Sequence, residues 1–317
     1  MSIRTAYYMI ICIFIILIIL PMLLLHGVFR GQDGDGSILL KVYKHQSDQI
    51  EKMLLDEYLR GVLAAEMPAL YHMEALKAQA VAARTYTVKQ LPAYGGPGCR
   101  ENPAADISTD YRSNQAWLSE NEMKEKWGFI SYFYNWARIN RAVEQTEGEV
   151  LVYNEKVIDA VYHANSGGQT EDSTFVWGEM HPYLQSVSSP YDQERSENYL
   201  NTFYFGVDEL RAKLGLSGED SSPFIELTHR SSSGRVIELT AGDKKITGND
   251  FRSLLGLTSN KFEISRTGDI FTITVFGKGH GVGMSQDGAD GYARAGYNYR
   301  QILEHYYPGT KIGRLKK

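Results

Sequence analysis

Glu66 is the residue whose surroundings point most directly to proton-transfer chemistry. The other residues of the range 64–68 are apolar, and burial among such groups raises the pKa of a carboxyl, whereas Arg84 would lower that pKa if it lay close. A glutamate beside a proline is in most proteins an ordinary surface residue. The chemistry of Glu66 therefore depends on the motifs that accompany it.

Two glycine-containing segments could supply further polar groups. In 277–283 glycine takes every second position, which lets a ligand or another backbone approach closely and leaves His280 and Gln286 as the useful polar side chains. His163 leads in the same way into Ser166 and two glycines. Each segment could equally be a structural corner or a solvated turn.

A serine hydrolase and a phosphate-binding loop both fit poorly. Neither Ser166 nor Ser285 lies in a GxSxG motif, and no Asp is placed to orient a particular histidine. The range 277–286 matches neither GxxxxGK[ST] nor GxGxxG, because Met284 stands where the last glycine of the second motif would be.

The residue pattern places these motifs on mixed helices and antiparallel hairpins, which is the α+β class. Pro68 ends a helix that Glu66 closes, and an alanine-rich helix follows. Each glycine-containing segment follows a predicted hairpin. The ranges predicted to be helical are 54–65, 73–89, 122–143, 250–255, 288–295 and 299–306; a strand is predicted at 38–43, a loop at 94–110, and hairpins at 150–162, 225–239 and 262–276.

Charge and cysteine content narrow the possible functions. The 317 residues carry a formal net charge of −5, and we find no local basic patch, so no nucleic acid is expected as a partner. Of the two cysteines, Cys12 lies in an apolar run and Cys99 in a Gly/Pro loop. The soluble part therefore cannot form an internal disulfide.

The N-terminus carries a predicted membrane anchor. Residues 7–25 contain no charged residue and are long enough to span a bilayer, and no small-x-small cleavage site follows them. We therefore predict a cytosolic tail at 1–6, a single-pass transmembrane anchor at 7–25, a linker at 26–36 and one catalytic domain at 37–317.

Four segments, in this order, closely resemble the stage II sporulation protein D family. They are Tyr58–Pro68 (YLRGVLAAEMP), Glu74–Tyr86 (EALKAQAVAARTY), His163–Gly168 (HANSGG) and Gly279–Gln286 (GHGVGMSQ), and the resemblance covers essentially all of 37–317. It implies a lytic transglycosylase that cleaves peptidoglycan strands, stripped of their stem peptides, between N-acetylmuramic acid and N-acetylglucosamine during engulfment in sporulation. The implied partners are these glycan strands and stage II sporulation proteins M and P.

Residue by residue, the resemblance implies that Glu66 is the catalytic glutamate. It also implies that the alanine-rich helix lines the glycan groove and that the two glycine-containing segments contact glycan. Because peptidoglycan lies outside the cytoplasm, the domain at 37–317 is expected on the extracytoplasmic side of the mother-cell engulfing membrane. The residues implied to bind substrate are Lys77, Gln79, Arg84, Tyr86, His163, Ser166, His280 and Gln286.

The sequence departs from the family pattern at 105–117. Some relatives carry Cys and His residues there that can bind zinc, whereas this range has neither residue type. Cys99 alone would not make a structural zinc site, which needs four ligands. We therefore expect no metal and no other cofactor.

One carboxyl suffices for a transglycosylase, although hydrolytic glycosidases normally use two. If the C6 hydroxyl of the sugar is the nucleophile, the attack is intramolecular, and an effective molarity on the order of 10⁵ M or more replaces an enzymic nucleophile. Glu66 would protonate the leaving oxygen and then take the proton of that hydroxyl as the 1,6-anhydro ring closes.

Two other functions fit the same residues. Proteins that share this domain include amidase enhancers, so one alternative is a non-catalytic peptidoglycan-binding module that enhances a partner amidase. The other is a membrane signalling ectodomain, which would bind a small ligand without turnover. The enzyme alone should release anhydro-muramic ends from denuded glycan, whereas neither alternative should release any.

Overall fold

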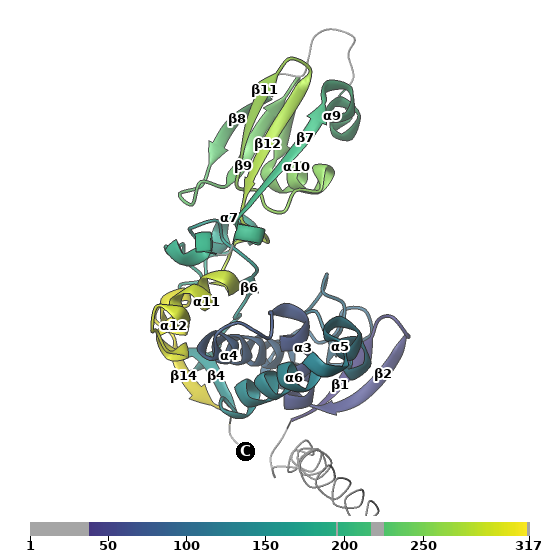
Figure 1. The fold of residues 1–317 in the computed structure, drawn as a ribbon, viewed down its shortest axis with the longest axis vertical. Helices are drawn as coiled ribbons and strands as arrows, with labels where there is room; N and C mark the ends of the chain where they lie inside the picture. The colour runs from purple at the N-terminus through teal and green to yellow at the C-terminus, as the bar shows by residue number, and fades with distance from the viewer. Residues whose placement is uncertain (1–37, 195, 217–224, 316–317) are drawn as a thin grey trace, which may run out of the picture. The chain divides into compact units, whose positions relative to one another are not determined.

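Helices and mainly antiparallel sheets alternate along the chain in the computed structural model (Figure 1), which confirms the predicted α+β class. The structure describes residues 38–194, 196–216 and 225–315. The predicted tail, anchor and linker, which together span 1–36, lie outside these residues. Within the described ranges no helix is both long and apolar enough to cross a membrane.

The first strand pairs with a strand that the sequence pattern did not predict. β1 (Leu39–Lys44) corresponds to the predicted strand at 38–43 and pairs antiparallel with β2 (Gln49–Leu54) and parallel with β3 (Ile107–Ser108). The first four residues of β2 are exposed at the edge of the sheet. No alternation of apolar residues therefore marks β2 as a strand in the sequence.

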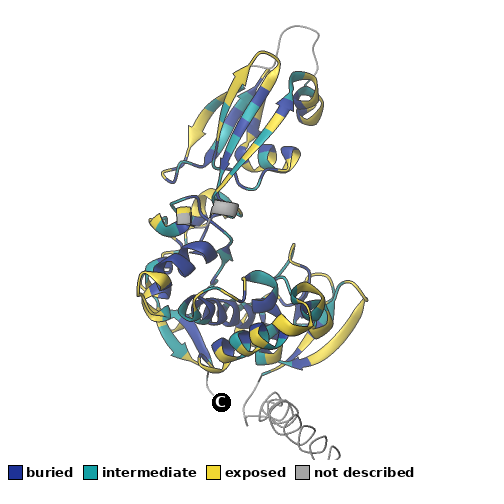
Figure 2. Ribbon diagram, viewed as in Figure 1, coloured by how far each residue is buried: buried dark blue, intermediate teal, exposed yellow. Residues whose placement is uncertain are grey.

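Two consecutive helices carry Glu66 and the alanine-rich motif. α3 (Leu55–Glu66) and α4 (Met73–Gln90) match their predicted ranges within about a residue, and both pack against α6 (Phe129–Glu144). Twelve of the 18 residues of α4 are buried, as its dark blue ribbon in Figure 2 shows. A helix that is apolar on most of its sides is stable only when other elements surround it.

The single helix predicted at 122–143 is wrong, because the structure has two helices there. α5 (Glu120–Trp127) begins with a capping box between Ser119 and Glu122. It ends at Gly128, whose φ of 73° lies in the left-handed region that favours glycine. α6 starts at the next residue.

The hairpin predicted at 150–162 is shorter than expected. β4 (Glu149–Tyr153) pairs with only a two-residue β5 (Lys156–Val157). β6 (Tyr162–His163) instead pairs in parallel with β13 (Met284–Ser285). This pairing brings the two glycine-containing segments together, although they are more than a hundred residues apart in the sequence.

Two three-stranded antiparallel sheets share one hydrophobic core between residues 200 and 276. The hairpins predicted at 225–239 and 262–276 are confirmed as β8–β9 and β11–β12, whereas β7, α9 and β10 were not predicted. The elements are β7 (Leu200–Gly206), α9 (Val207–Leu214), β8 (Ile225–Arg230), β9 (Val236–Ala241), β10 (Lys244–Thr247), α10 (Gly248–Leu255), β11 (Phe262–Thr267) and β12 (Ile270–Phe276).

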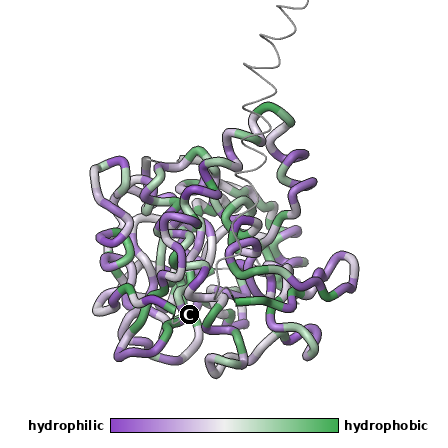
Figure 3. Tube along the Cα trace, turned by 90° about the horizontal axis from the view of Figure 1, so that it is seen from below, coloured by the Kyte–Doolittle hydropathy of each residue, from purple (hydrophilic) through white to green (hydrophobic). Residues whose placement is uncertain are grey.

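The C-terminal helices pack against α4. α11 (Gln286–Arg294) and α12 (Tyr299–Tyr306) lie where helices were predicted, and β14 (Lys311–Arg314) pairs with β4. Figure 3 shows hydrophobic and hydrophilic residues interspersed along the Cα trace. The remaining short elements are η2 (Pro92–Tyr94), α7 (Ser173–Trp177), η3 (Pro190–Glu194) and α8 (Ser196–Tyr199).

Candidate functional site

Glu66 is the last residue of α3, as the sequence predicts. Pro68 disfavours a helical conformation at the residue before it, and Met67 is accordingly extended, with φ −129° and ψ 139°, and buried. The helix therefore ends at a defined place, and Glu66 itself remains only half-buried. A carboxyl in this position can be held rigidly and still reach a ligand.

A segment that follows β3 fixes the Glu66 carboxylate. The Ala116 N–H donates to Glu66 Oε1 at 2.7 Å, and the Leu118 N–H donates to the Gly61 carbonyl at 3.2 Å. A Cβ added to Gly61 would lie 2.1 Å from the Trp117 indole nitrogen, so only glycine lets this segment lie on α3. Because Oε1 already accepts a hydrogen bond, Oε2 is the oxygen left to carry a proton.

The surroundings of Glu66 raise the pKa of its carboxyl. Burial is the largest cause, and the Ala116 N–H, the Gln286 amide and the positive charge of Lys126 oppose it. Lys126, on α5, donates to the Ala64 carbonyl at 2.9 Å, so its charge lies beside the last turn of α3. A raised pKa keeps more of the carboxyl protonated near neutral pH, as a general acid requires.

Lys126→Met is expected to raise the pKa of Glu66 further, because it removes a positive charge that favours the carboxylate. If Glu66 acts as an acid, the alkaline limb of the pH–rate profile should move to higher pH. The direct measurement is NMR titration of the Glu66 carboxyl carbon. Lys124→Met on the same helix is the control, since Lys124 pairs with Glu120; an equal shift in both variants would contradict a specific effect of Lys126.

Tyrosines and a glutamine surround the carboxylate. The pKa values of Tyr58, Tyr86 and Tyr162 are raised, chiefly by burial, and the negative charge of Glu66 adds to the effect. Tyr162 Oη donates to Gln115 Oε1 at 2.6 Å. These phenols therefore stay protonated and can serve only as hydrogen-bond donors or acceptors and as apolar faces.

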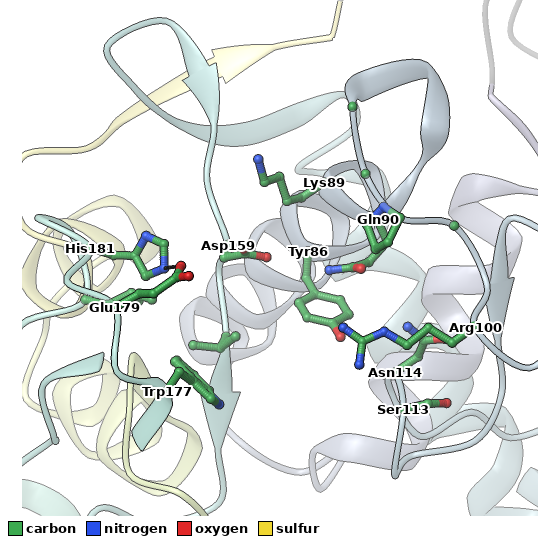
Figure 4. Close-up of a pocket in the computed structure, with 16 residues that line it drawn as sticks. Tyr86, Lys89, Gln90, Arg100, Ser113, Asn114, Asp159, Trp177, Glu179 and His181 are labelled. Atoms are coloured by element: carbon green, nitrogen blue, oxygen red, sulfur yellow. Dashed lines mark ion pairs between the residues drawn. The ribbon is translucent and has the colours of Figure 1, made fainter. Parts of the chain in front are cut away.

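A cavity of about 500 Å³ is lined in part by Tyr86. Figure 4 shows Tyr86, Arg100 and neighbouring polar side chains on one side, and Trp177 with His181 on the other. Asp159 contributes a second carboxyl, whose pKa is raised by burial. Aromatic faces beside charged and amide groups form a surface suited to a sugar, which has both apolar ring faces and hydroxyl groups.

The predicted residues of α4 occupy different environments. Tyr86 lines the cavity, whereas Gln79, seven residues earlier on the same face, is fully buried. Neither amide atom of Gln79 has a hydrogen-bond partner within the described part of the chain, so a water or ligand atom is expected there. Lys77 forms an ion pair with Glu74 at 2.7 Å beside α12 and is not among the groups that shift the pKa of Glu66.

Arg84 is completely buried and links several elements. Its Nε and Nη2 donate to Asp56 Oδ1 at 3.3 and 3.1 Å. Nη1 donates to the carbonyls of Thr146 and Glu149 at 2.7 and 3.3 Å, and Nη2 donates to the carbonyl of Val143 at 3.3 Å. All five N–H groups of the guanidinium are therefore engaged within the protein. This geometry leaves Arg84 no donor for direct contact with glycan.

His163 and His280 lie together, with ring centroids 5.5 Å apart. His163 Nδ1 donates to the Val282 carbonyl at 3.0 Å, and His280 Nε2 donates to the Tyr162 carbonyl at 3.1 Å while its Nδ1 accepts from the Val282 N–H at 3.1 Å. These partners assign the tautomers. Burial lowers the pKa of both imidazoles, that of His280 to about 4, so both are neutral at neutral pH.

The melting temperature should therefore fall as the pH drops from about 6.5, the pKa of an unfolded histidine, toward about 4, the folded pKa of His280. The folded protein binds fewer protons than the unfolded chain in this range, so stability is complete above it and is lost as the pH falls. The slope should be smaller in His163→Gln and His280→Gln, and unchanged in His229→Gln, whose imidazole is exposed. Identical slopes in all four proteins would contradict this expectation.

Ser166 belongs to a buried hydrogen-bond cluster centred on Asp192. Its N–H donates to Asp192 Oδ2 at 3.0 Å, and its hydroxyl donates to the same oxygen. The hydroxyls of Ser189 and Ser285 donate to Asp192 Oδ1 at 2.9 and 2.6 Å. Ser166 thus helps to hold the two glycine-containing segments together, and its hydroxyl is directed to a carboxylate and not to a histidine.

Gln286 brings the second glycine-containing segment to the catalytic candidate. It opens α11 after Ser285, whose side chain caps the helix. The Gln286 amide lies near enough to lower the pKa of Glu66, although its Nε2 meets no partner at hydrogen-bond distance and angle among the residues that the structure describes. Two of the predicted binding residues are thus coupled to Glu66: Gln286 lowers the pKa of Glu66, and the charge of Glu66 raises the pKa of Tyr86.

The described ranges contain no group of three or more His, Cys, Asp or Glu residues that could hold a metal ion. The Cys99 thiol is free and buried. That this protein needs no zinc stays a prediction, under which a chelator should leave melting temperature and activity unchanged. Stoichiometric zinc in the purified protein would contradict it.

Several site residues were not predicted from the sequence. Ala116 and Lys126 act on Glu66 from segments that pack on α3, and no periodic pattern in the sequence predicts that packing. Arg100, Asp159 and Trp177 line the cavity from loops or from the end of a short helix. For Arg100 and Trp177 the one signal was the local density of Gly, Pro and aromatic residues. That composition indicates exposed loops but does not tell which loops meet.

Fold and site together define an α+β protein in which the charge of a half-buried glutamate, Glu66, acts on a tyrosine that lines a polar and aromatic cavity. A family model described as "Stage II sporulation protein" matches residues 43–153. The chain is 39% identical to stage II sporulation protein D of Bacillus amyloliquefaciens, over 88% of this chain and 79% of that protein, and 38% identical to that of Bacillus subtilis, over 87% and 79%. The chain belongs to the stage II sporulation protein D family. An amidase enhancer of Bacillus subtilis is 28% identical over 80% of this chain and 40% of its own length.

Proposed function

We propose that this protein is a lytic transglycosylase that cleaves denuded peptidoglycan between N-acetylmuramic acid and N-acetylglucosamine during engulfment. The observation that carries the proposal is the setting of Glu66. Its carboxyl is half-buried, has a raised pKa and is oriented by the Ala116 N–H, and its charge raises the pKa of Tyr86, which lines a cavity with aromatic faces. Membership of a sporulation family supports the biological setting.

In the proposed reaction Glu66 serves both as acid and as base. Oε2 gives its proton to the glycosidic oxygen, and the bond between that oxygen and C1 of muramic acid breaks. The C6 hydroxyl of the same sugar attacks C1 and returns a proton to the carboxylate, so the products are a 1,6-anhydro end and a free hydroxyl on N-acetylglucosamine. The Ala116 N–H stabilises the carboxylate between the two steps, which a hydrogen bond to the charged form favours.

Asp159 is the observation that favours a second candidate function. A hydrolytic glycosidase needs a second carboxyl to activate water or to attack the sugar, and Asp159 lines the cavity that Tyr86 also lines. Hydrolysis would leave a reducing muramic acid end, whereas the proposed reaction leaves an anhydro end lighter by one water. A non-catalytic module that enhances an amidase would leave the glycan uncut.

Mass spectrometry of denuded glycan after incubation with the purified full-length protein separates these functions. Anhydro-muramic ends that require Glu66 are the expected result. Reducing ends that require Asp159 would establish hydrolysis, and intact glycan would favour the binding module. Asp159→Asn is expected to reduce turnover less than Glu66→Gln, since only Glu66 moves a proton in the proposed reaction.

We further propose that residues 7–25 anchor the protein in the mother-cell engulfing membrane, with 37–317 outside the cytoplasm and with stage II sporulation proteins M and P as partners. The uncharged run at 7–25 and the extracytoplasmic position of peptidoglycan support this arrangement. Fractionation of the cells and co-precipitation with proteins M and P test it. A soluble form that begins near residue 27 would contradict the anchor.

A further inference from the structure

Arg100 presents a guanidinium to the cavity and forms no ion pair within the described part of the chain. Its side chain is exposed and lies in Figure 4 next to Tyr86 and Asn114. No hydrogen bond or ion pair of the Arg100 guanidinium occurs among the residues that the structure describes. An arginine in a cavity that pairs with no protein group is available to a ligand.

The other charged groups of the cavity have opposite charges close to them. Lys89 and His181 both lower the pKa of Asp159, and His181 Nε2 lies 4.0 Å from a Glu179 carboxylate oxygen. Arg100 instead acts on a neutral phenol, because it lowers the pKa of Tyr86 while Asp159 and Glu66 raise it. Among the described residues that line the cavity, Arg100 is therefore a cation available to pair with an anionic ligand.

We propose that Arg100 forms a carboxylate-binding subsite, and that it binds the lactyl carboxylate of an N-acetylmuramic acid residue whose stem peptide has been removed. This inference rests on the proposed function and adds to it the residue that selects the substrate. A guanidinium binds a carboxylate through two parallel hydrogen bonds. When the stem peptide is attached, the lactyl group is an uncharged amide, and that charged pair cannot form.

The cavity supplies the remaining contacts of such a sugar. Tyr86 lies beside Arg100, and Trp177 lines the other side of the cavity (Figure 4), so a pyranose ring bound in the cavity would meet aromatic side chains. Gln90 offers an amide group to hydroxyl and N-acetyl groups, whereas Asn114 Oδ1 already accepts the Ser108 N–H at 2.9 Å. These contacts do not depend on charge, so they should bind glycans with or without a lactyl carboxylate.

Binding measurements with the full-length protein test the subsite without relying on turnover. All proteins carry Glu66→Gln, so that the glycan is not cut during the measurement. The first ligand is a denuded tetrasaccharide of alternating N-acetylglucosamine and N-acetylmuramic acid, and the second is a tetramer of N-acetylglucosamine alone. Arg100→Ala should weaken binding of the first by about tenfold, a moderate value because the exposed charge is screened, and should leave binding of the second within about twofold. Arg100→Lys should restore part of the difference.

Arg141→Ala is the matched control, since Arg141 is an exposed arginine of α6 that does not line the cavity. It should leave both affinities unchanged. The proposal is overturned if Arg100→Ala weakens both ligands equally, weakens neither, or if the wild-type chain binds neither. The contrast between the two ligands can hold even when the protein releases no anhydro ends, so a failure of the proposed reaction is distinguishable from a failure of this subsite.

Discussion

Glu66→Gln is expected to lower the release of anhydro-muramic products by about 10² to 10⁴-fold, the usual contribution of general acid or base catalysis. The amide keeps the size of the carboxyl, and its oxygen can still accept the Ala116 N–H that now binds Oε1. It cannot donate a proton and take one back. Because one carboxyl serves both steps of the proposed reaction, a loss at the upper end of that range is expected.

The same variant should be as stable as the wild type or slightly more stable. Folding raises the pKa of Glu66, so at neutral pH the ionised carboxylate costs folding free energy, and a neutral amide removes that cost. Lost activity without lost stability is what distinguishes a catalytic group from a structural one. Melting curves and product release measured on the same samples give both quantities.

Glu57→Gln is the control for Glu66→Gln, because it makes the same substitution at an exposed position of the same helix. Its activity should stay within about twofold of the wild type, as surface changes usually do. If a well-folded Glu66→Gln protein released anhydro-muramic products at close to the wild-type rate, Glu66 would not be the catalyst. The peptidoglycan-binding module would then be the better interpretation.

The sequence predicted the elements that local rules determine. Pro68 ended α3 at Glu66, the alanines of α4 predicted a buried helix, and the pattern at 299–306 predicted α12 with its bounds. The predictions of helices and strands failed where a single residue interrupted a periodic pattern, or where a strand had no periodic pattern. Gly128 divided a helix that is amphipathic on both sides of it, and the exposed edge strand β2 has no apolar face to detect.

The site was predictable only in part, because its key contacts join segments that are far apart in the sequence. The pattern identified Glu66 and apolar neighbours, but not the Ala116 N–H that orients the carboxyl or the Lys126 charge that opposes its raised pKa. Family resemblance implied that eight further residues bind substrate, but a match to a motif does not show which of them touch it. A buried residue that only supports the site can match a family motif just as well as a residue that touches substrate. Arg84 is such a buried residue.

Arg84→Met is expected to destabilise the protein by about 3 kcal/mol, the lower end of the usual cost of breaking a buried ion pair by removing one partner, because Asp56 is partly exposed. Asp56 would lose its positive partner, and the carbonyls of Val143, Thr146 and Glu149 would each lose a donor inside the protein. Arg84→Lys should recover little of this, because an ammonium group has three donors where the structure uses five. Urea unfolding of the variants measures the change.

Arg60→Met is the matched control, since the half-buried Arg60 of α3 donates through Nε to Asn140 at 2.6 Å and belongs to no such network. It should cost about 1 kcal/mol, the contribution of a typical hydrogen bond. At a temperature where Arg84→Met is still folded, its affinity for denuded glycan should be close to that of the wild type, because the Arg84 guanidinium is sealed from solvent. A stable Arg84→Met protein that no longer bound glycan would contradict a purely structural role of Arg84. It would show that Arg84 reaches the substrate after a rearrangement that frees its donors.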